Sequence, residues 1–296
     1  MSSISNKIVP HLWFDKEAKE AANFYVSLFP NSKIKGITTI TDTPSGDADI
    51  VSFNLWGSDF MAISAGPMFK FNPSISLFVY CGSEKEIDRI YKSLMVDGQA
   101  MMPLDKYPWS PKYAWVQDKY GLTWQLDVED INSQQKILPS LLFVNEKQTM
   151  VKEALNFYHN TFPNSRMILE APYDKSANLP EGSLLFAQYN LSGSLINAMS
   201  STLKHDYDFN EAVSLMVYCE NQEEIDYYWE KFTREGQEQS CGWLKDKYGV
   251  SWQIVPTIMD KMMSTANKEQ LDRVTQVMLT MMKLDIKKLQ DAYGNS

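Results

Sequence analysis

The stretch DKYGLTWQL at residues 118–126 returns as DKYGVSWQI at residues 246–254. Three other segments repeat in the same order, and they are KIVPHLWF (7–14) with KILPSLLF (136–143), NFYVSLFPNS (23–32) with NFYHNTFPNS (156–165), and SLFVYCGSEKEID (76–88) with SLMVYCENQEEID (214–226). Each copy spans nearly the whole of its half of the 296-residue chain. A period this long indicates a duplicated domain, because solenoid repeats recur roughly every 20 to 50 residues.

The first copy contains the element order β-α-β-β-β twice. Apolar residues at helical spacing predict a first helix from Ala18 to Leu28, and Pro30 ends it because proline cannot continue the backbone hydrogen-bond ladder. A second helix, 84–96, stops at Gly98. Alternating apolar residues predict the strands, which are 8–14, 33–41, 50–56, 60–64, 74–81, 99–103, 112–117 and 122–128. The second copy matches module for module, so the chain contains four βαβββ modules.

These patterns predict an α+β protein with two tandem domains and a helical tail. The polar segment EDINSQQ (129–135) is the predicted linker, because it has no apolar periodicity. The tail has two apolar stripes at helical spacing, of which the second is Ile286, Leu289 and Tyr293. We expect the first stripe to dock onto the domains or onto a second chain. The expected boundaries are 5–130 and 135–256 for the domains and 257–296 for the tail, and the first stripe consists of Leu271, Val274, Met278 and Met281.

Composition excludes several classes of protein. The formal charge is −9, with 37 acidic against 28 basic residues and no basic run, which argues against nucleic acid as a partner because phosphate binding needs a clustered cationic surface. No apolar stretch approaches the roughly 20 residues that span a bilayer, and the N-terminus lacks a signal-peptide pattern. Three cysteines are too few for a disulfide framework. We therefore expect a cytoplasmic protein with no membrane partner.

Four segments resemble one known family, and they are IVPHLWFDKEAKEAANFYVSLFPNS (8–32), YPWSPKYAWVQDKYGLTWQL (107–126), CGWLKDKYGVSWQIVP (241–256) and RVTQVMLTMMKLDIKKLQDAYG (273–294). They resemble the PhnB-like branch of the vicinal oxygen chelate superfamily, which includes glyoxalases, bleomycin-resistance proteins and dioxygenases. This branch is often labelled 3-demethylubiquinone-9 3-methyltransferase-like. The resemblance implies tandem glyoxalase-like domains, in which the two modules of each copy pair and their curved sheets form a cup that holds a ligand. Four modules in one chain imply a fused pseudo-dimer.

The resemblance also implies where a metal would bind. Metal-using members of the superfamily take His and Glu ligands from the first and last strands of each module, and the Glu follows a D-x-x-G turn. This chain has Gln125 and Gln253 there, and glutamine is a neutral donor that binds divalent metals more weakly than carboxylate does. His11 lies near the first-ligand position, but its counterpart is Ser140. We expect no cofactor, and a divalent metal remains an alternative without supporting ligand residues.

The methyltransferase label has no support in the sequence. A nucleotide-fold methyltransferase binds S-adenosylmethionine through a glycine-rich turn after its first strand. No two glycines in this chain are separated by a single residue.

The remaining candidates for ligand binding are mostly aromatic residues, which give an apolar pocket a polar edge. Trp124 and Gln125 point to opposite faces of their strand, and the superfamily position favours the glutamine as the residue that faces the cup. Cys241 precedes two lysines, which could activate its thiol, although a packed cysteine is the simpler interpretation. The full set of candidates is His11, Trp13, Trp109, Tyr113, Trp115, Gln125, Cys241, Trp243 and Gln253.

The first copy also has an insertion, MPLDKYPWSPKY (102–113), which the second copy lacks. This segment is a candidate lid over one cup, or alternatively a contact between domains or subunits.

Two functional hypotheses follow. The first is a protein that binds a small apolar or aromatic molecule without a catalytic metal. The second is an enzyme of the glyoxalase or dioxygenase type that uses His11 and Gln125 in a degenerate site. The sequence assigns no catalytic residue, and it is compatible with either a monomeric pseudo-dimer or a homodimer.

Overall fold

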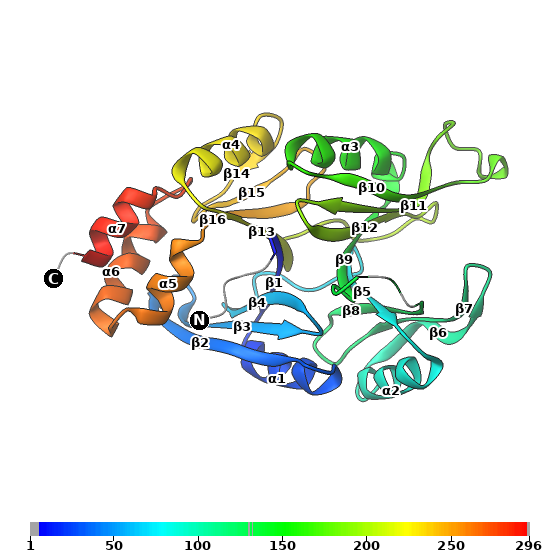
Figure 1. The fold of residues 1–296 in the computed structure, drawn as a ribbon, viewed down its shortest axis with the longest axis horizontal. Helices are drawn as coiled ribbons and strands as arrows, with labels where there is room; N and C mark the ends of the chain where they lie inside the picture. The colour runs from blue at the N-terminus through cyan, green and yellow to red at the C-terminus, as the bar shows by residue number, and fades with distance from the viewer. Residues whose placement is uncertain (1–5, 130, 132, 295–296) are drawn as a thin grey trace.

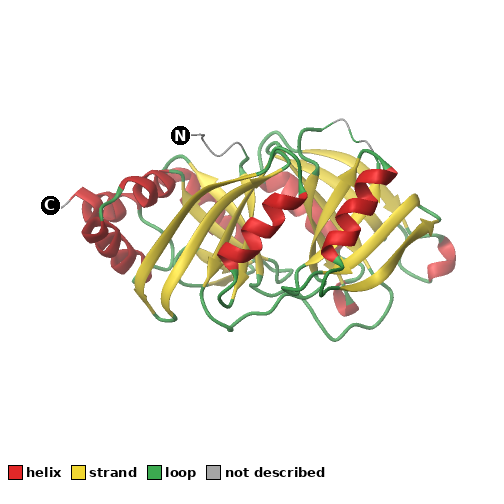
Figure 2. Ribbon diagram, turned by 90° about the horizontal axis from the view of Figure 1, so that it is seen from below, coloured by secondary structure: helices red, strands yellow, loops and turns green. Residues whose placement is uncertain are grey.

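The computed structural model describes residues 6–129, 131 and 133–294. They form two eight-stranded sheets that lie side by side, with four helices on their outer faces and three more at one end of the molecule (Figures 1 and 2). The strand order is β14-β15-β16-β13-β1-β4-β3-β2 in sheet A and β10-β11-β12-β9-β5-β8-β7-β6 in sheet B. This is the α+β architecture that the repeats predicted.

The element bounds follow the predicted modules closely. Module 1 contains β1 (Ile8–Phe14), α1 (Ala18–Leu28), β2 (Lys33–Thr43), β3 (Gly46–Leu55) and β4 (Ser58–Ser64). Module 2 contains β5 (Ile75–Cys81), α2 (Glu84–Leu94), β6 (Gln99–Tyr107), β7 (Ser110–Gln117) and β8 (Thr123–Val128). Module 3 contains β9 (Ile137–Phe143), α3 (Val151–Thr161), β10 (Arg166–Pro172), β11 (Leu184–Leu191) and β12 (Ser194–Ser200). Module 4 contains β13 (Val213–Cys219), α4 (Gln222–Thr233), β14 (Gln237–Glu238), β15 (Trp243–Lys245) and β16 (Ser251–Pro256).

The two sheets do not follow the boundaries of the two sequence copies. Sheet A joins modules 1 and 4 through antiparallel pairing of β1 with β13, and sheet B joins modules 2 and 3 through pairing of β5 with β9. Each sheet therefore takes one module from each copy. The expectation that each copy encloses a cup of its own was wrong, because the repeat identifies equivalent modules and does not say which of them pair.

Strand alternation places one set of side chains toward the helices and the other on the opposite face of each sheet. The helix-facing set forms one large core that includes Tyr25 of α1 and Tyr158 of α3. Trp124 and Trp252 belong to this core and are fully buried. Their neighbours Gln125 and Gln253 therefore lie on the opposite face, which we call the inner face of each sheet.

The tail forms α5 (Ile258–Thr265), α6 (Lys268–Leu279) and α7 (Ile286–Gly294) and packs against the inner face of sheet A. In Figure 1 these orange and red helices stand at the open end of that sheet. Within the first predicted stripe, Val274 and Met281 are buried, and Leu271 and Met278 are partly buried in clusters with residues of sheet A. The predicted docking of the tail onto the domains is confirmed.

Among the described helices, none is long and apolar enough to cross a membrane.

Candidate ligand-binding face of sheet B

The inner face of sheet B has a row of neutral polar side chains at its centre. Ser76 on β5 lies opposite Ser140 on β9, and Asn197 on β12 is the next neighbour of Ser140. Gln125 on the adjacent strand β8 donates from Nε2 to Ser76 Oγ at 2.7 Å. Each of these side chains is almost completely buried. The row therefore offers hydroxyl and amide groups and no charge.

The amide of Gln125 is held by hydrogen bonds. The Tyr113 hydroxyl on β7 donates to Gln125 Oε1 at 2.7 Å, while Nε2 donates to Ser76. Burial raises the pKa of Tyr113 far above its ordinary value, so its hydroxyl stays protonated and remains a donor. The orientation of Gln125 is thus defined by a donor on one side and an acceptor on the other.

A second hydrogen-bond network crosses the same face. The Tyr80 hydroxyl accepts hydrogen bonds from Gln188 Nε2 at 2.9 Å and from Asn197 Nδ2 at 3.3 Å. Gln188 Nε2 also lies 3.0 Å from Asn197 Oδ1. Because Tyr80 is on β5 and Gln188 is on β11, three strands away in sheet order, the phenol reaches across the face.

Aromatic rings surround these polar groups. Phe78 lies 4.7 Å from Tyr80 and 6.1 Å from Phe186, centroid to centroid. Tyr107 lies 5.6 Å from Tyr113 at the other side of the face. Rings at these separations form a continuous apolar surface with polar atoms at its edge.

The insertion in the first copy is a hairpin, made by β6 and β7, and not a loop. At its turn, Trp109 stacks on Tyr107 with ring centroids 5.1 Å apart and lies edge-on to Tyr113 at 5.7 Å. Trp109 is 60% exposed although it is a large aromatic residue. The hairpin therefore holds an exposed ring over the rim of the inner face of sheet B.

Trp115 provides an unused hydrogen-bond donor on this face. It pairs with Gln125 across β7 and β8 and packs among the same aromatic residues. Its Nε1 atom is buried, and no hydrogen-bond partner for it occurs among residues 6–129, 131 and 133–294. Burial of an N–H group without a hydrogen-bond partner costs free energy. A ligand whose acceptor atom bonded to Trp115 Nε1 would remove this cost, which would favour its binding.

The other predicted residues lie on sheet A, under or beside the tail. His11 is 5% exposed and lies edge-on to Trp243 at 5.4 Å, and burial lowers the pKa of its imidazole to about 3. Gln253 donates to Ser214 Oγ at 2.9 Å, which repeats the pair formed by Gln125 and Ser76. Trp13 Nε1 donates to the Gly66 carbonyl at 2.8 Å.

Cys241 anchors the tail through its backbone. Its N–H donates to the Met281 carbonyl at 2.7 Å, and the next N–H, of Gly242, donates to the Met282 carbonyl at 2.7 Å. Burial raises the pKa of the Cys241 thiol, which is the opposite of activation. The cationic activation considered from the sequence is therefore wrong, and Lys245 pairs with Glu211 instead.

The structure thus divides the nine predicted residues between two sheets. Sheet A carries His11, Trp13, Trp243 and Gln253, with Cys241 in the turn before β15, and sheet B carries Tyr113, Trp115 and Gln125, with Trp109 in the turn between β6 and β7. A degenerate site that combines His11 with Gln125 is wrong, because these residues belong to different sheets. Sequence reasoning missed Phe78, Tyr80, Gln188 and Asn197. The alternation of SLFVYC could have indicated the first two, since they share a face with Ser76.

The donors at the centres of the two inner faces do not fit the metal that the family resemblance implies. On sheet B the four central positions are Ser76, Gln125, Ser140 and Asn197, and on sheet A they are Ser214, Gln253, His11 and Met61. Divalent sites usually combine three or four imidazole, thiolate or carboxylate donors. The described residues contain no group of three or more His, Cys, Asp or Glu that could hold a metal ion.

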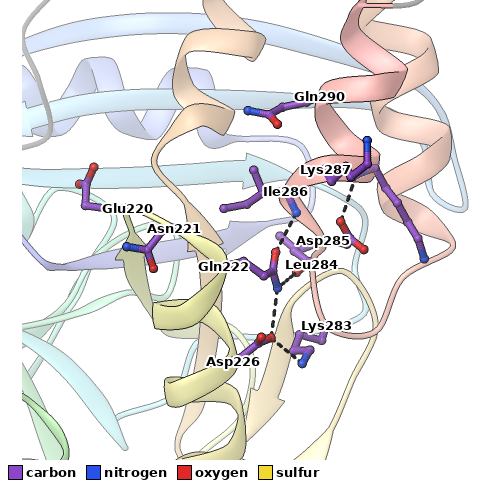
Figure 3. A pocket seen from close by; sticks show the side chains of 11 residues that line it. Glu220, Asn221, Gln222, Asp226, Lys283, Leu284, Asp285, Ile286, Lys287 and Gln290 are labelled. Carbon is purple, nitrogen blue, oxygen red and sulfur yellow. Dashed lines mark hydrogen bonds and ion pairs between the residues drawn. The ribbon is translucent and has the colours of Figure 1, made fainter.

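A separate pocket of about 660 Å³ lies between the starts of α4 and α7 (Figure 3). Gln222 there donates to the Leu284 carbonyl and accepts from the Ile286 N–H, while Asp226 pairs with Lys283. These contacts join the tail to module 4. The pocket contains none of the predicted site residues.

Solved glyoxalase and dioxygenase structures share this fold. A glyoxalase I mutant from Zea mays has a TM-score of 0.56 at 9% identity and covers 85% of this chain and 94% of its own. A candidate dioxygenase from Bacillus subtilis has a TM-score of 0.51 at 9% identity and covers 98% of this chain and 96% of its own. Identities this low show the fold alone.

The family is shown by sequence. The model of the 3-demethylubiquinone-9 3-methyltransferase family matches residues 6–127 and again 135–255, and the chain belongs to that family. The PhnB protein from Bacillus cereus is 40% identical over 42% of this chain and 100% of its own, with a TM-score of 0.40. No significant match was found among the curated proteins.

Proposed function

We propose that the protein binds a small apolar or aromatic molecule at the inner face of sheet B, without a catalytic metal at that face. The observation that supports this most strongly is the asymmetry between the two inner faces. The tail packs its apolar side chains onto sheet A, whereas sheet B has aromatic rings and oriented amide groups beside a hairpin that holds Trp109 exposed. Small-molecule sites typically combine such an apolar lining with a few oriented polar groups.

The residues of sheet B have separate roles in this proposal. Phe78 and Phe186 supply flat apolar surface for the body of the ligand. Trp115 Nε1 donates to an acceptor atom of the ligand, because this N–H has no partner in the described part of the chain. Gln125 is already engaged by Tyr113 and Ser76, so it shapes the face and is not the primary contact.

The test uses N-phenyl-1-naphthylamine, a neutral aromatic probe whose fluorescence increases in apolar surroundings. We expect the wild-type chain to bind it and F186A to bind it about fivefold more weakly or worse, because a buried aromatic contact contributes roughly 1 kcal/mol or more. The matched control is F69A, since Phe69 is also partly buried but lies beside Trp13 of sheet A. It should leave the affinity unchanged.

Two results would contradict the proposal. One is an absence of probe binding to the wild-type chain. The other is equal loss of affinity in F186A and F69A, which would place the probe elsewhere or show a general loss of structure.

A further inference from the structure

Asp127 is a buried carboxylate on the inner face of sheet B. Its neighbour Leu126 points into the core, so Asp127 points to the opposite face of β8, and only 8% of its surface is exposed. The Ser110 hydroxyl donates to its Oδ1 atom. No Lys, Arg or His within the ranges 6–129, 131 and 133–294 forms an ion pair with it. A buried charge is normally paired with an opposite charge, because desolvation is otherwise uncompensated.

Two tyrosines flank this carboxylate. Tyr80 on β5 and Tyr113 on β7 are its register partners on either side of β8. Burial raises the pKa of Tyr80, and the negative charges of Glu129 and Asp127 raise it further. Burial also raises the pKa of Tyr113, and the charge of Asp127 adds to that increase. The charges that act on both hydroxyls are therefore negative. Burial, together with the charge of Glu129, also raises the pKa of the Asp127 carboxyl, against the lowering effect of the Ser110 hydrogen bond, and a cation beside it would favour the ionised form.

The second copy provides an internal comparison. Alignment of DKYGLTWQLD with DKYGVSWQIV places Val255 where the first copy has Asp127, and Tyr218 where it has Tyr80. Val255 packs in the apolar cluster that the tail forms on sheet A. An apolar residue therefore satisfies the fold at this position, so the carboxylate on sheet B is not required by the architecture alone.

We propose that the ligand of sheet B is an organic cation whose ammonium group lies between the Asp127 carboxylate and the rings of Tyr80 and Tyr113. Aromatic faces attract cations through their quadrupoles, and a desolvated carboxylate supplies the opposite charge. The apolar body of the ligand then lies against Phe78, 4.7 Å from Tyr80. This inference rests on the proposed function, since it names the chemical class of the ligand at the same face.

The test compares three probes of similar size by calorimetry on the full chain. They are benzyltrimethylammonium, benzyl alcohol and benzoate, which carry a positive charge, no charge and a negative charge. We expect the cation to bind roughly tenfold more tightly than the alcohol and benzoate to bind most weakly, because charge complementarity and ring contact act together.

Variants then assign the effect to one carboxylate. D127N should lose roughly tenfold in affinity for the cation and keep its affinity for the alcohol. D127V introduces the side chain that occupies the equivalent position of the second copy, and it should behave in the same way if D127N does not fold. The control is D105N, because Asp105 is an exposed carboxylate on β6 opposite Tyr113, and its removal should leave the cation affinity within about twofold.

The outcomes separate the two proposals. Equal affinity of the wild-type chain for cation and alcohol, or full cation affinity in both Asp127 variants, would overturn the cation assignment and leave ligand binding at sheet B intact. Failure of all three probes together with N-phenyl-1-naphthylamine would overturn both.

Discussion

The hydroxyl of Tyr25 on α1 donates a 2.8 Å hydrogen bond to Oδ2 of Asp118 in the turn between β7 and β8. Since α1 packs on sheet A and β8 belongs to sheet B, this bond joins the two modules of the first copy across the two sheets. The second copy repeats it between Tyr158 and Asp246 at 2.6 Å. The repeated DKYG motif is therefore a structural anchor between the sheets.

Replacing Asp118 with asparagine should destabilise the protein. Its Oδ2 accepts from Tyr25 and from Trp124 Nε1, and its Oδ1 accepts from the backbone N–H groups of Tyr120 and Leu122. Asparagine has one acceptor oxygen in place of two, so two buried donors lose their partner, at a cost of about 2 kcal/mol or more. Urea denaturation measures the loss in the free energy of unfolding. Y25F removes a single bond and should cost about 1 kcal/mol, and an unchanged midpoint for D118N would contradict the anchoring role.

Deleting residues 258–296 should lower the melting temperature or change the oligomeric state, because the apolar inner face of sheet A loses its cover. A matched pair of single substitutions tests the same contact. M281A should lower the free energy of unfolding by about 2 kcal/mol or more, because Met281 is only 7% exposed. M282A should change it by less than about 0.5 kcal/mol, because Met282 is 44% exposed. Calorimetry measures the melting temperature, and light scattering measures the oligomeric state. A deletion variant that is unchanged by both methods would mean that the tail is a free arm.

Docking of the tail should weaken as the pH rises. Burial raises the pKa of Asp260 from 3.8 to about 6, against the opposing charge of Lys35, and Tyr218 lies 3.5 Å from its Oδ1. The folded state then binds the Asp260 proton more tightly than the unfolded chain does. The contribution of Asp260 to the free energy of unfolding therefore falls as the pH rises from about 4 to about 6, by roughly 3 kcal/mol at most. D260N should remove this component. Stability curves that stay parallel for the two proteins would contradict the prediction.

The β6–β7 hairpin should act as a lid over sheet B. W109A, alone or with Y113A, should weaken binding of N-phenyl-1-naphthylamine about fivefold or more, because the rings at its rim are lost. The titration must use the full chain, since fragments 1–133 and 134–296 would divide both sheets. Unchanged affinity in both variants would leave the hairpin as a contact between domains or subunits.

The purified protein should hold no stoichiometric Zn, Ni, Mn or Fe. The positions that the superfamily uses for ligands carry neutral amide and hydroxyl groups at sheet B and a single histidine at sheet A, and a divalent site needs about three or four suitable donors. Elemental analysis tests this directly. One tightly bound equivalent per chain would contradict the prediction.

The sequence by itself determined the modules of this protein. Helix α1 and strand β8 could be predicted because the spacing of apolar residues is a local property that burial on one face imposes. The opposite orientations of Trp124 and Gln125 follow from strand alternation together with the family resemblance. The apolar stripes of the tail were also visible, because helical periodicity needs no partner to be read.

Only the tertiary structure decided which modules pair and which inner face the tail covers. The equivalent strands β5 and β13, ISLFVYC and VSLMVYC, present similar edges. Strand β1 could therefore pair within its copy or across copies, and no local pattern separates these arrangements. Pairing of β1 with β13 places His11 beside Ser214, and pairing of β5 with β9 places Ser76 beside Ser140. The candidate site depends on these non-local contacts, because a binding face is made by side chains that only the packed sheets bring together.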